Sequence, residues 1–169
     1  YNGRIARFLS KSYIKNSQKN IDRINDIGHN LSEHVILCGY GRSGQFLGRF
    51  LKEEHIPFIA IDMDLNRVND ASNAGELVMY GDASRRVVLN AAGIKNCKAV
   101  IITYADDRAS SKVLTVIRET YEDLPVIVRT ADESSISLLQ REGATEVVPE
   151  VLEGSLMLGS HALMVLGIP

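Results

Sequence analysis

The stretch HVILCGYGRSG, residues 34–44, decides the fold of this chain. Its apolar residues 35–38 suit a strand buried on both faces, and glycines follow at once at positions 39, 41 and 44 in G-x-G-x-x-G spacing. This spacing after a strand is typical of a tight turn that leads into a helix, whose N-terminus attracts an anion. The stretch therefore predicts the start of a nucleotide-binding unit.

Each glycine of this turn has its own expected role. Gly39 permits the turn, Gly41 lets the backbone approach a pyrophosphate, and Gly44 lets the helix pack closely on the strand. The helix over residues 45–51 is expected to face the sheet with its four large apolar side chains: Phe46, Leu47, Phe50 and Leu51. An alternative stays open, in which the glycines only make a tight turn and bind no ligand.

A second buried strand, residues 57–62, ends in Asp62, 18 residues after Gly44. In dinucleotide-binding Rossmann units a carboxylate at this distance accepts hydrogen bonds from a ribose. Because such a carboxylate disfavours a 2′-phosphate, we expect NAD(H) or an adenine mononucleotide rather than NADP as ligand. The alternative is that Asp62 only caps the strand.

Up to residue 149 the chain alternates short apolar runs with helical segments. Four further strands are predicted at 77–80, 99–102, 125–128 and 146–148, and helices at about 64–74, 84–91, 106–120 and 132–141. Helical crossovers predict an α/β fold: a Rossmann-like, doubly wound parallel sheet of six strands in the order 3-2-1-4-5-6. We expect the ligand at the switch between strands 1 and 4, and Asp64 and Ser84 as helix caps.

Polar residues follow the carboxyl ends of the later strands. Asp82 and Ala83 follow the third strand, Thr103 follows the fourth, and Arg129 ends the fifth. Asp82 and the Ala83 backbone could frame an adenine, while Arg42 could lie near the phosphates. Asp82 could instead serve only a turn before a helix, and Arg129 could instead form a salt bridge between subunits.

The composition favours one domain with a substantial core and no nucleic-acid partner. The chain has 169 residues, 45% of them hydrophobic, and a formal net charge of −2. No apolar run reaches the length of a transmembrane helix, and no signal peptide is visible. Cys38 and Cys97 are expected to stay reduced and to pack as small apolar residues. Because the chain begins with Tyr1, we expect it to be part of a longer protein.

The two ends of the chain differ from the central segment, residues 34–149. Residues 1–33 are basic and weakly amphipathic, which suits a helical linker beside an anionic membrane surface or a solvated linker. Residues 150–169 include a helix that is apolar nearly all round and too short to cross a bilayer. We expect that helix to be covered on one side by its own domain and on the other by a second subunit, which predicts a homodimer.

Catalytic and metal-binding residues are not expected. The sequence has no Tyr-x-x-x-Lys motif, no Cys-x-x-Cys pair and no Ser/His/Asp arrangement in a recognisable context, and its four histidines lie without metal-ligand spacing. A nucleotide site without a reaction partner is most simply a sensor. Two alternatives stay open: a dinucleotide-binding fragment of an NAD-dependent oxidoreductase, and a dimerisation domain without a ligand.

Six motifs carry a family resemblance: GYGRSGQ at 39–45, ID at 61–62, YGDAS at 80–84, AAGI at 91–94, VR at 128–129 and EGA at 142–144. Together they resemble the regulator-of-potassium-conductance domain, also called the TrkA N-terminal or KTN domain. The run EGSL at 153–156 and the apolar helix around it are similar to the Kef-type members, the cytosolic domains of monovalent cation:proton antiporters.

This resemblance implies a regulatory homodimer at the cytoplasmic face of the inner membrane that binds NAD(H), AMP, ADP or ATP. It would pass its ligand state to a transmembrane potassium channel or antiporter domain in the same full-length chain. The candidate cofactor-binding residues are Gly39, Tyr40, Gly41, Arg42, Ser43, Gly44, Asp62, Met63, Asp82, Ala83, Thr103 and Arg129. Glutathione-gated Kef members carry a second Arg two residues beyond Arg129, where this chain has Ala131, so glutathione control is not implied.

Overall fold

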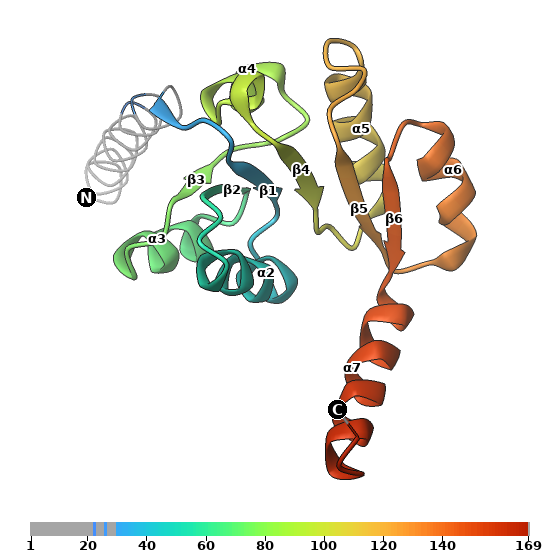
Figure 1. Cartoon of the computed structure of the whole chain (residues 1–169). Helices are drawn as coiled ribbons and strands as arrows, with labels where there is room; N and C mark the ends of the chain where they lie inside the picture. The colour runs from blue at the N-terminus through green and yellow to red at the C-terminus, as the bar shows by residue number, and fades with distance from the viewer. Residues whose placement is uncertain (1–21, 23–25, 27–29, 169) are drawn as a thin grey trace, which may run out of the picture.

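A computed structural model describes residues 22, 26 and 30–168, and it contains a six-stranded parallel sheet (Figure 1). The order is β3-β2-β1-β4-β5-β6, and every neighbouring pair is parallel. The strands are β1 (Val35–Cys38), β2 (Phe58–Asp62), β3 (Val78–Tyr80), β4 (Ala99–Ile102), β5 (Val126–Thr130) and β6 (Glu146–Pro149). The predicted doubly wound α/β sheet and its strand order are confirmed.

Helices cover both faces of the sheet. They are α2 (Arg42–Glu53), α3 (Leu65–Asn73), α4 (Arg86–Ala91), α5 (Asp107–Arg118) and α6 (Ile136–Arg141), with 3₁₀ turns at Ile94–Asn96 and Glu133–Ser135. A further helix, α7 (Glu150–Val165), follows β6 and covers neither face. The apolar cluster that includes α2 and α3 lies on one face, and the larger cluster that includes α4, α5 and α6 lies on the other. This is the layer arrangement that helical crossovers between parallel strands produce.

The central strand β1 supplies both apolar clusters. Its side chains alternate, so Val35 and Leu37 belong to the α2 and α3 face while Ile36 and Cys38 belong to the other. Strand β1 is buried throughout, as expected for a strand with helices on both sides. The carboxyl end of β1 is therefore fixed by packing on two faces, which holds the turn that follows it.

The side of α2 that faces the sheet agrees with the prediction at Leu47 and Leu51, which pack on the core, and differs from it at Phe46 and Phe50. Phe46 and Phe50 are 55% and 53% exposed, and the buried residues of the helix are Gly44, Gly48 and Leu51. A Cβ atom at Gly48 would lie 2.9 Å from the ring of Phe58. The helix approaches the sheet through its small residues, and this close approach turns the two phenylalanines outward.

Two of the predicted helix starts hold and one does not. Asp64 caps α3 by accepting from the Asn66 and Arg67 amides, and Asp106 caps α5 in the same way. Ser84 does not cap α4, which begins two residues later than the predicted start. The Ser84 amide and hydroxyl instead donate to the Asp82 carboxylate, at 2.9 Å and 2.7 Å.

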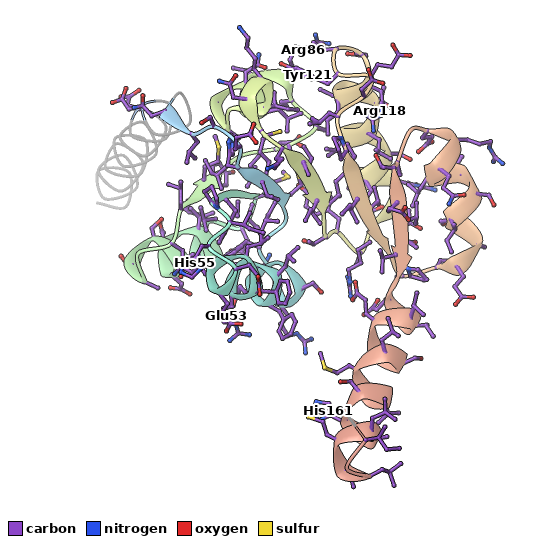
Figure 2. The ribbon with its side chains drawn as sticks, in the orientation of Figure 1. Glu53, His55, Arg86, Arg118, Tyr121 and His161 are labelled. Carbon is purple, nitrogen blue, oxygen red and sulfur yellow. The ribbon has the colours of Figure 1, made fainter. Side chains whose placement is uncertain are left out.

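Helix α7 begins directly after β6 and extends away from the sheet (Figure 1). None of its residues is buried, and Figure 2 shows its side chains, His161 among them, projecting from a helix that no other element covers. The prediction that its own domain covers one side is therefore wrong, because α7 leaves the domain at the sheet edge. Nearly all of the predicted basic arm, residues 1–33, lies outside the described residues. Within the described residues, no helix combines the length and apolarity that a bilayer span requires.

Candidate functional site

The carboxyl edge of the sheet carries a cleft of about 1010 Å³ at the β1/β4 switch. Its wall includes ten of the predicted site residues: Gly39, Gly41, Arg42, Ser43, Gly44, Asp62, Met63, Asp82, Thr103 and Arg129. A much smaller cavity of about 160 Å³, bounded in part by Arg86 and Tyr121, lies at the opposite end of the sheet (Figure 2). The large cleft is therefore the candidate site.

The glycine turn is tightly constrained at two of its three glycines. Gly39 has φ +102°, and a Cβ atom there would lie 2.5 Å from Oγ1 of Thr103. A Cβ atom at Gly44 would lie 2.2 Å from the carbonyl oxygen of Gly39. At Gly41 the nearest atom to such a Cβ is 3.9 Å away, in Arg67. Gly41 is thus the glycine at which the backbone lies open to the cleft.

Helix α2 begins at this turn without a side-chain cap. Gly41 occupies the N-cap position, no side chain accepts from the first amides, and no acidic residue stands in the first turn. Unpaired amides and the partial positive charge of a helix N-terminus favour an anion at this position. Arg42, in the first turn, adds a full positive charge at the same cleft wall.

Asp62 ends β2, and backbone amides from the turn after β1 and from the turn after β2 hold its nearly buried carboxylate. The Tyr40 amide donates to its Oδ2 and the Asp64 amide donates to its Oδ1, each at 2.7 Å. Arg67 Nη1 lies 3.1 Å from Oδ2 and 3.3 Å from Oδ1. The orientation of the carboxylate is therefore set by two backbone groups, with a guanidinium beside it.

The end of β4 is tied to the glycine turn. The Thr103 hydroxyl lies 3.0 Å from the carbonyl oxygen of Gly39 and 3.2 Å from that of Cys38, and it can donate to either. The neighbouring Tyr104 also lines the cleft, and burial raises the pKa of its phenol. The Tyr104 hydroxyl is therefore protonated at neutral pH and available as a donor.

Asp82 serves the turn after β3 and also lies at the cleft wall. Its carboxylate accepts from Ser84 in the turn after β3, as the turn hypothesis requires. Asp82 and Ser84 nevertheless both line the cleft. The carboxylate is thus pre-oriented at the cleft wall by the turn itself.

Arg129 joins the cleft to helix α7. Its side chain is 15% exposed, and Nη2 lies 2.8 Å from Glu150 Oε1 while Nε donates to Glu153 Oε2 at 3.3 Å. Arg129 and Glu150 both line the cleft. In the structure Arg129 pairs with the first turn of α7 in its own chain.

Two predicted residues do not line the cleft. Tyr40 is 5% exposed and stacks on Phe58 in the core, with ring centroids 6.5 Å apart, so only its backbone reaches Asp62. Ala83 is fully buried in the other apolar cluster. The turns after β1 and β3 direct these two side chains into the core.

Several cleft residues were missed by sequence reasoning. They are Arg67, Ser84, Tyr104, Ala105, Asp106, Arg108, Ala109, Lys112, Val113 and Glu150. Most of them belong to the β4–α5 loop and the first turns of α5, which must meet the cleft because that loop leaves the carboxyl end of β4. Arg108 and Lys112, one helical turn apart, could have been found by this rule.

Cys38 is buried in the core, and Cys97 is partly buried. Burial raises the pKa of Cys38 to about 12 and that of Cys97 to about 11, so both stay thiols at neutral pH. Neither forms a disulfide. Among residues 22, 26 and 30–168, no group of three or more His, Cys, Asp or Glu side chains is arranged to hold a metal ion.

The sequence of the chain matches one family model and several known proteins. The model of the TrkA-N domain matches residues 35–150. The chain is 38% identical over 170 residues to a protein of Alkalimonas amylolytica named "Putative K(+) efflux antiporter KefB", covering 100% of this chain and 26% of that protein. It is 30% identical over 151 residues to K(+) efflux antiporter 3, chloroplastic, of Arabidopsis thaliana, covering 85% and 20%. The chain spans about a quarter or less of the length of these relatives.

Solved structures are similar in fold. The Kef CTD of Shewanella denitrificans in its AMP bound form superposes with a TM-score of 0.65 at 28% identity, covering 79% of this chain and 81% of that one. The TrkA-N domain of the inner membrane protein ybaL from Escherichia coli gives a TM-score of 0.70 at 24% identity, covering 77% and 96%.

Proposed function

The chain belongs to the TrkA-N domain family, and from this premise we propose that it is a regulatory domain that binds NAD(H) or an adenine nucleotide and controls a potassium transporter. The cleft at the β1/β4 switch is the proposed binding site. The proposed adenine nucleotides are AMP, ADP and ATP. In this proposal the cleft binds the nucleotide and does not convert it.

One observation supports nucleotide binding most strongly. Gly41, the uncapped N-terminus of α2 and the carboxylate of Asp62 all lie on the wall of the same cleft. An open glycine and free helix amides suit a phosphate, and a fixed carboxylate suits ribose hydroxyls. The relative from Shewanella denitrificans, 28% identical, is described in an AMP bound form, which agrees with this ligand class.

The transport role rests on the relatives. Two of them carry names as K(+) efflux antiporters, and the chain spans only 26% and 20% of their length. We therefore propose that a transmembrane cation transporter domain is the partner, in the same full-length chain. The domain would then lie at the cytoplasmic face of the membrane. The chain's Ala131 gives no reason to include glutathione among its ligands.

A homodimer is part of the same proposal. Helix α7 exposes a run of large apolar side chains, among them Val151, Leu152, Leu156, Met157, Leu158, Leu163 and Met164. Contiguous apolar surface of this kind marks an interaction site. A second copy of the helix offers the same surface in return, as a two-fold interface requires.

Arg129 provides a physical link between ligand and helix. It lines the cleft, and its two ion pairs reach Glu150 and Glu153 in the first turns of α7. A ligand phosphate near Arg129 would compete with these carboxylates. The ligand would thereby bind one position of α7 better than another, which is the condition for a change in geometry.

Substitution of Gly41 by Ala tests the binding site without disturbing the fold. The new methyl group meets no atom closer than 3.9 Å in the protein, and φ of −69° accommodates alanine. It would nevertheless stand where a phosphate approaches the backbone. We expect calorimetric titration with AMP, ADP, ATP, NAD and NADH to give at least one ligand whose affinity falls by about tenfold or more in Gly41→Ala.

The matched control is Asn73→Ala at the exposed C-terminal end of α3, which lies outside both the cleft and α7. It should leave nucleotide affinity unchanged. Circular dichroism and thermal unfolding confirm that both variants remain folded. Equal affinity in Gly41→Ala and in the unaltered chain would refute the assignment of this cleft, and so would an absence of binding by every nucleotide.

A further inference from the structure

Arg67 stands beside the carboxylate that is proposed to receive the ribose. Its Nη1 atom lies 3.1 Å and 3.3 Å from the two oxygens of Asp62, and its Nη2 lies 3.6 Å from Oδ2 of Asp64. Arg67 also lines the cleft, and its Nη1 is the atom nearest to the open side of Gly41. The guanidinium therefore lies between the ribose carboxylate and the phosphate-binding turn.

The acceptor capacity of Asp62 is already shared in the structure. An ionised carboxylate offers about four acceptor positions. The Tyr40 and Asp64 amides take one on each oxygen, and Arg67 faces both oxygens from the remaining side. A ribose hydroxyl that binds Asp62 must consequently share it with Arg67 or displace that side chain.

The three partners of Asp62 differ in freedom. Tyr40 and Asp64 hold the carboxylate through backbone amides, which the β1 turn and the start of α3 fix in place. The Arg67 side chain is 41% exposed and comes from the first turns of α3. It is the one of these three groups that can move toward a ligand while the carboxylate stays where it is.

Arg67 offsets the negative charge of Asp62 at the proposed ribose position. A lone carboxylate repels a 2′-phosphate, which is the usual basis for selecting NAD over NADP, whereas a nearby Arg accommodates that phosphate. Here the guanidinium neutralises Asp62, and Arg carries five N–H donors in a planar fork that matches phosphate oxygens. The same cleft wall thus holds both the acid that binds a free 2′-hydroxyl and the cation that binds a 2′-phosphate.

We propose that Arg67 sets the ribose selectivity of the cleft and lets it accept a 2′-phosphate despite Asp62, an inference that rests on the proposed nucleotide-binding function. The site then takes NADP(H) as well as NAD(H). Arg67, five positions after Asp62, would offset the repulsion that Asp62 alone exerts on a 2′-phosphate.

The test is a calorimetric titration of the chain with NAD, NADP, AMP and 2′,5′-ADP at one fixed ionic strength. The unaltered chain should bind NADP within about tenfold of NAD. Arg67→Gln should raise the ratio of the NADP dissociation constant to the NAD dissociation constant by about tenfold or more, because it removes a charged hydrogen-bond donor to the phosphate. Arg67→Lys, which keeps the charge but not the fork, should raise the ratio less.

Arg108→Gln is the matched control. Arg108 also lines the cleft, on α5, so the variant loses the same charge without touching Asp62. It should weaken NAD and NADP alike and leave their ratio unchanged. Equal ratios in Arg67→Gln and Arg108→Gln would overturn the inference, as would an unaltered chain that binds NAD and AMP but neither NADP nor 2′,5′-ADP. A chain that binds none of the four ligands would overturn the inference, and one that binds neither these nor ADP, ATP or NADH would refute the proposed function as well.

Discussion

Gly41 and Gly44 lie three residues apart in one turn, and the structure gives them different tolerance for a side chain. A methyl group at Gly44 would meet the Gly39 carbonyl at 2.2 Å, whereas at Gly41 it would meet only the end of a flexible arginine at 3.9 Å. Gly44 therefore serves the fold through close packing of helix on strand. Gly41 has no such duty, so its substitution separates ligand binding from folding.

Arg129 allows a second test at the scale of single residues. Its guanidinium pairs with Glu150 and Glu153, both about half exposed. Removal of these competitors by Glu150→Gln with Glu153→Gln leaves Arg129 free for a ligand phosphate. We expect the nucleotide affinity, measured by calorimetry, to rise by about two- to fivefold, because exposed ion pairs contribute about 0.2–1 kcal/mol.

A change of the same net charge elsewhere provides the control for this experiment. Glu119 and Glu122 lie at or beyond the C-terminal end of α5 and do not line the cleft. Glu119→Gln with Glu122→Gln should change the affinity little. An affinity that stays constant in the Glu150 and Glu153 variant, or rises equally in both variants, would contradict a competition for Arg129.

The residues of the site were predictable to different degrees. The glycines and Asp62 follow from a spacing rule that has a physical cause, so the sequence identifies them. Arg67 does not follow from that rule, because its contact with Asp62 depends on where the first turn of α3 directs a long side chain. Tyr40 lies inside the motif, yet its ring packs on Phe58 and only its amide serves the site.

At the scale of elements, the hydrophobic pattern of α2 is correct at Leu47 and Leu51, which pack on the core, and wrong at Phe46 and Phe50, which are exposed. The pattern places Phe46 and Phe50 toward the sheet because large apolar side chains are usually buried. Close approach of a helix to a sheet instead requires small side chains, and Gly44 and Gly48 supply them. The exposed phenylalanines are a consequence of that approach, and they leave an apolar strip on the outer surface of α2.

Helix α7 carries a prediction about assembly. Leu156 and Leu163 lie two turns apart on its surface and are exposed in the single chain. Sedimentation equilibrium should find a dimer, and Leu156→Asp with Leu163→Asp should weaken it by about a hundredfold or more. Burial of one leucine contributes about 1.5–3 kcal/mol, and symmetry removes each contact twice.

Gly154→Asp with His161→Asp is the corresponding control, because it adds two carboxylates on the side of α7 away from Leu156 and Leu163 without removing an apolar side chain. It should disturb the dimer far less. Both variants should keep the thermal stability of the domain, since no residue of α7 is buried. A chain that sediments as a monomer at every concentration, or a dimer that resists the leucine changes, would exclude α7 as the interface.

At the scale of the whole molecule, the sheet was predictable and the direction of α7 was not. Strand order follows from parallel strands, right-handed crossovers and a glycine turn that marks the switch point. Among residues 30–168 no strand follows helix α7, so the strand pattern did not fix its position. Its apolar surface indicated burial, and the described residues of a single chain provide none.

The charge of the molecule is also distributed unevenly. The chain carries a formal net charge of −2, yet the cleft collects five cationic side chains: Arg42, Arg67, Arg108, Lys112 and Arg129. Four carboxylates share that wall: Asp62, Asp82, Asp106 and Glu150. A ligand that combines phosphates with a ribose fits such a mixed wall better than a simple anion does.

The central claim is that a nucleotide in this cleft controls ion transport. Its most direct test is the potassium flux of the full-length protein that carries this domain, reconstituted in lipid vesicles, with and without the nucleotide found to bind. We predict that the nucleotide changes the flux by several-fold to about a hundredfold, and that Gly41→Ala loses this response while Asn73→Ala keeps it. Identical flux with and without the bound nucleotide would contradict the claim.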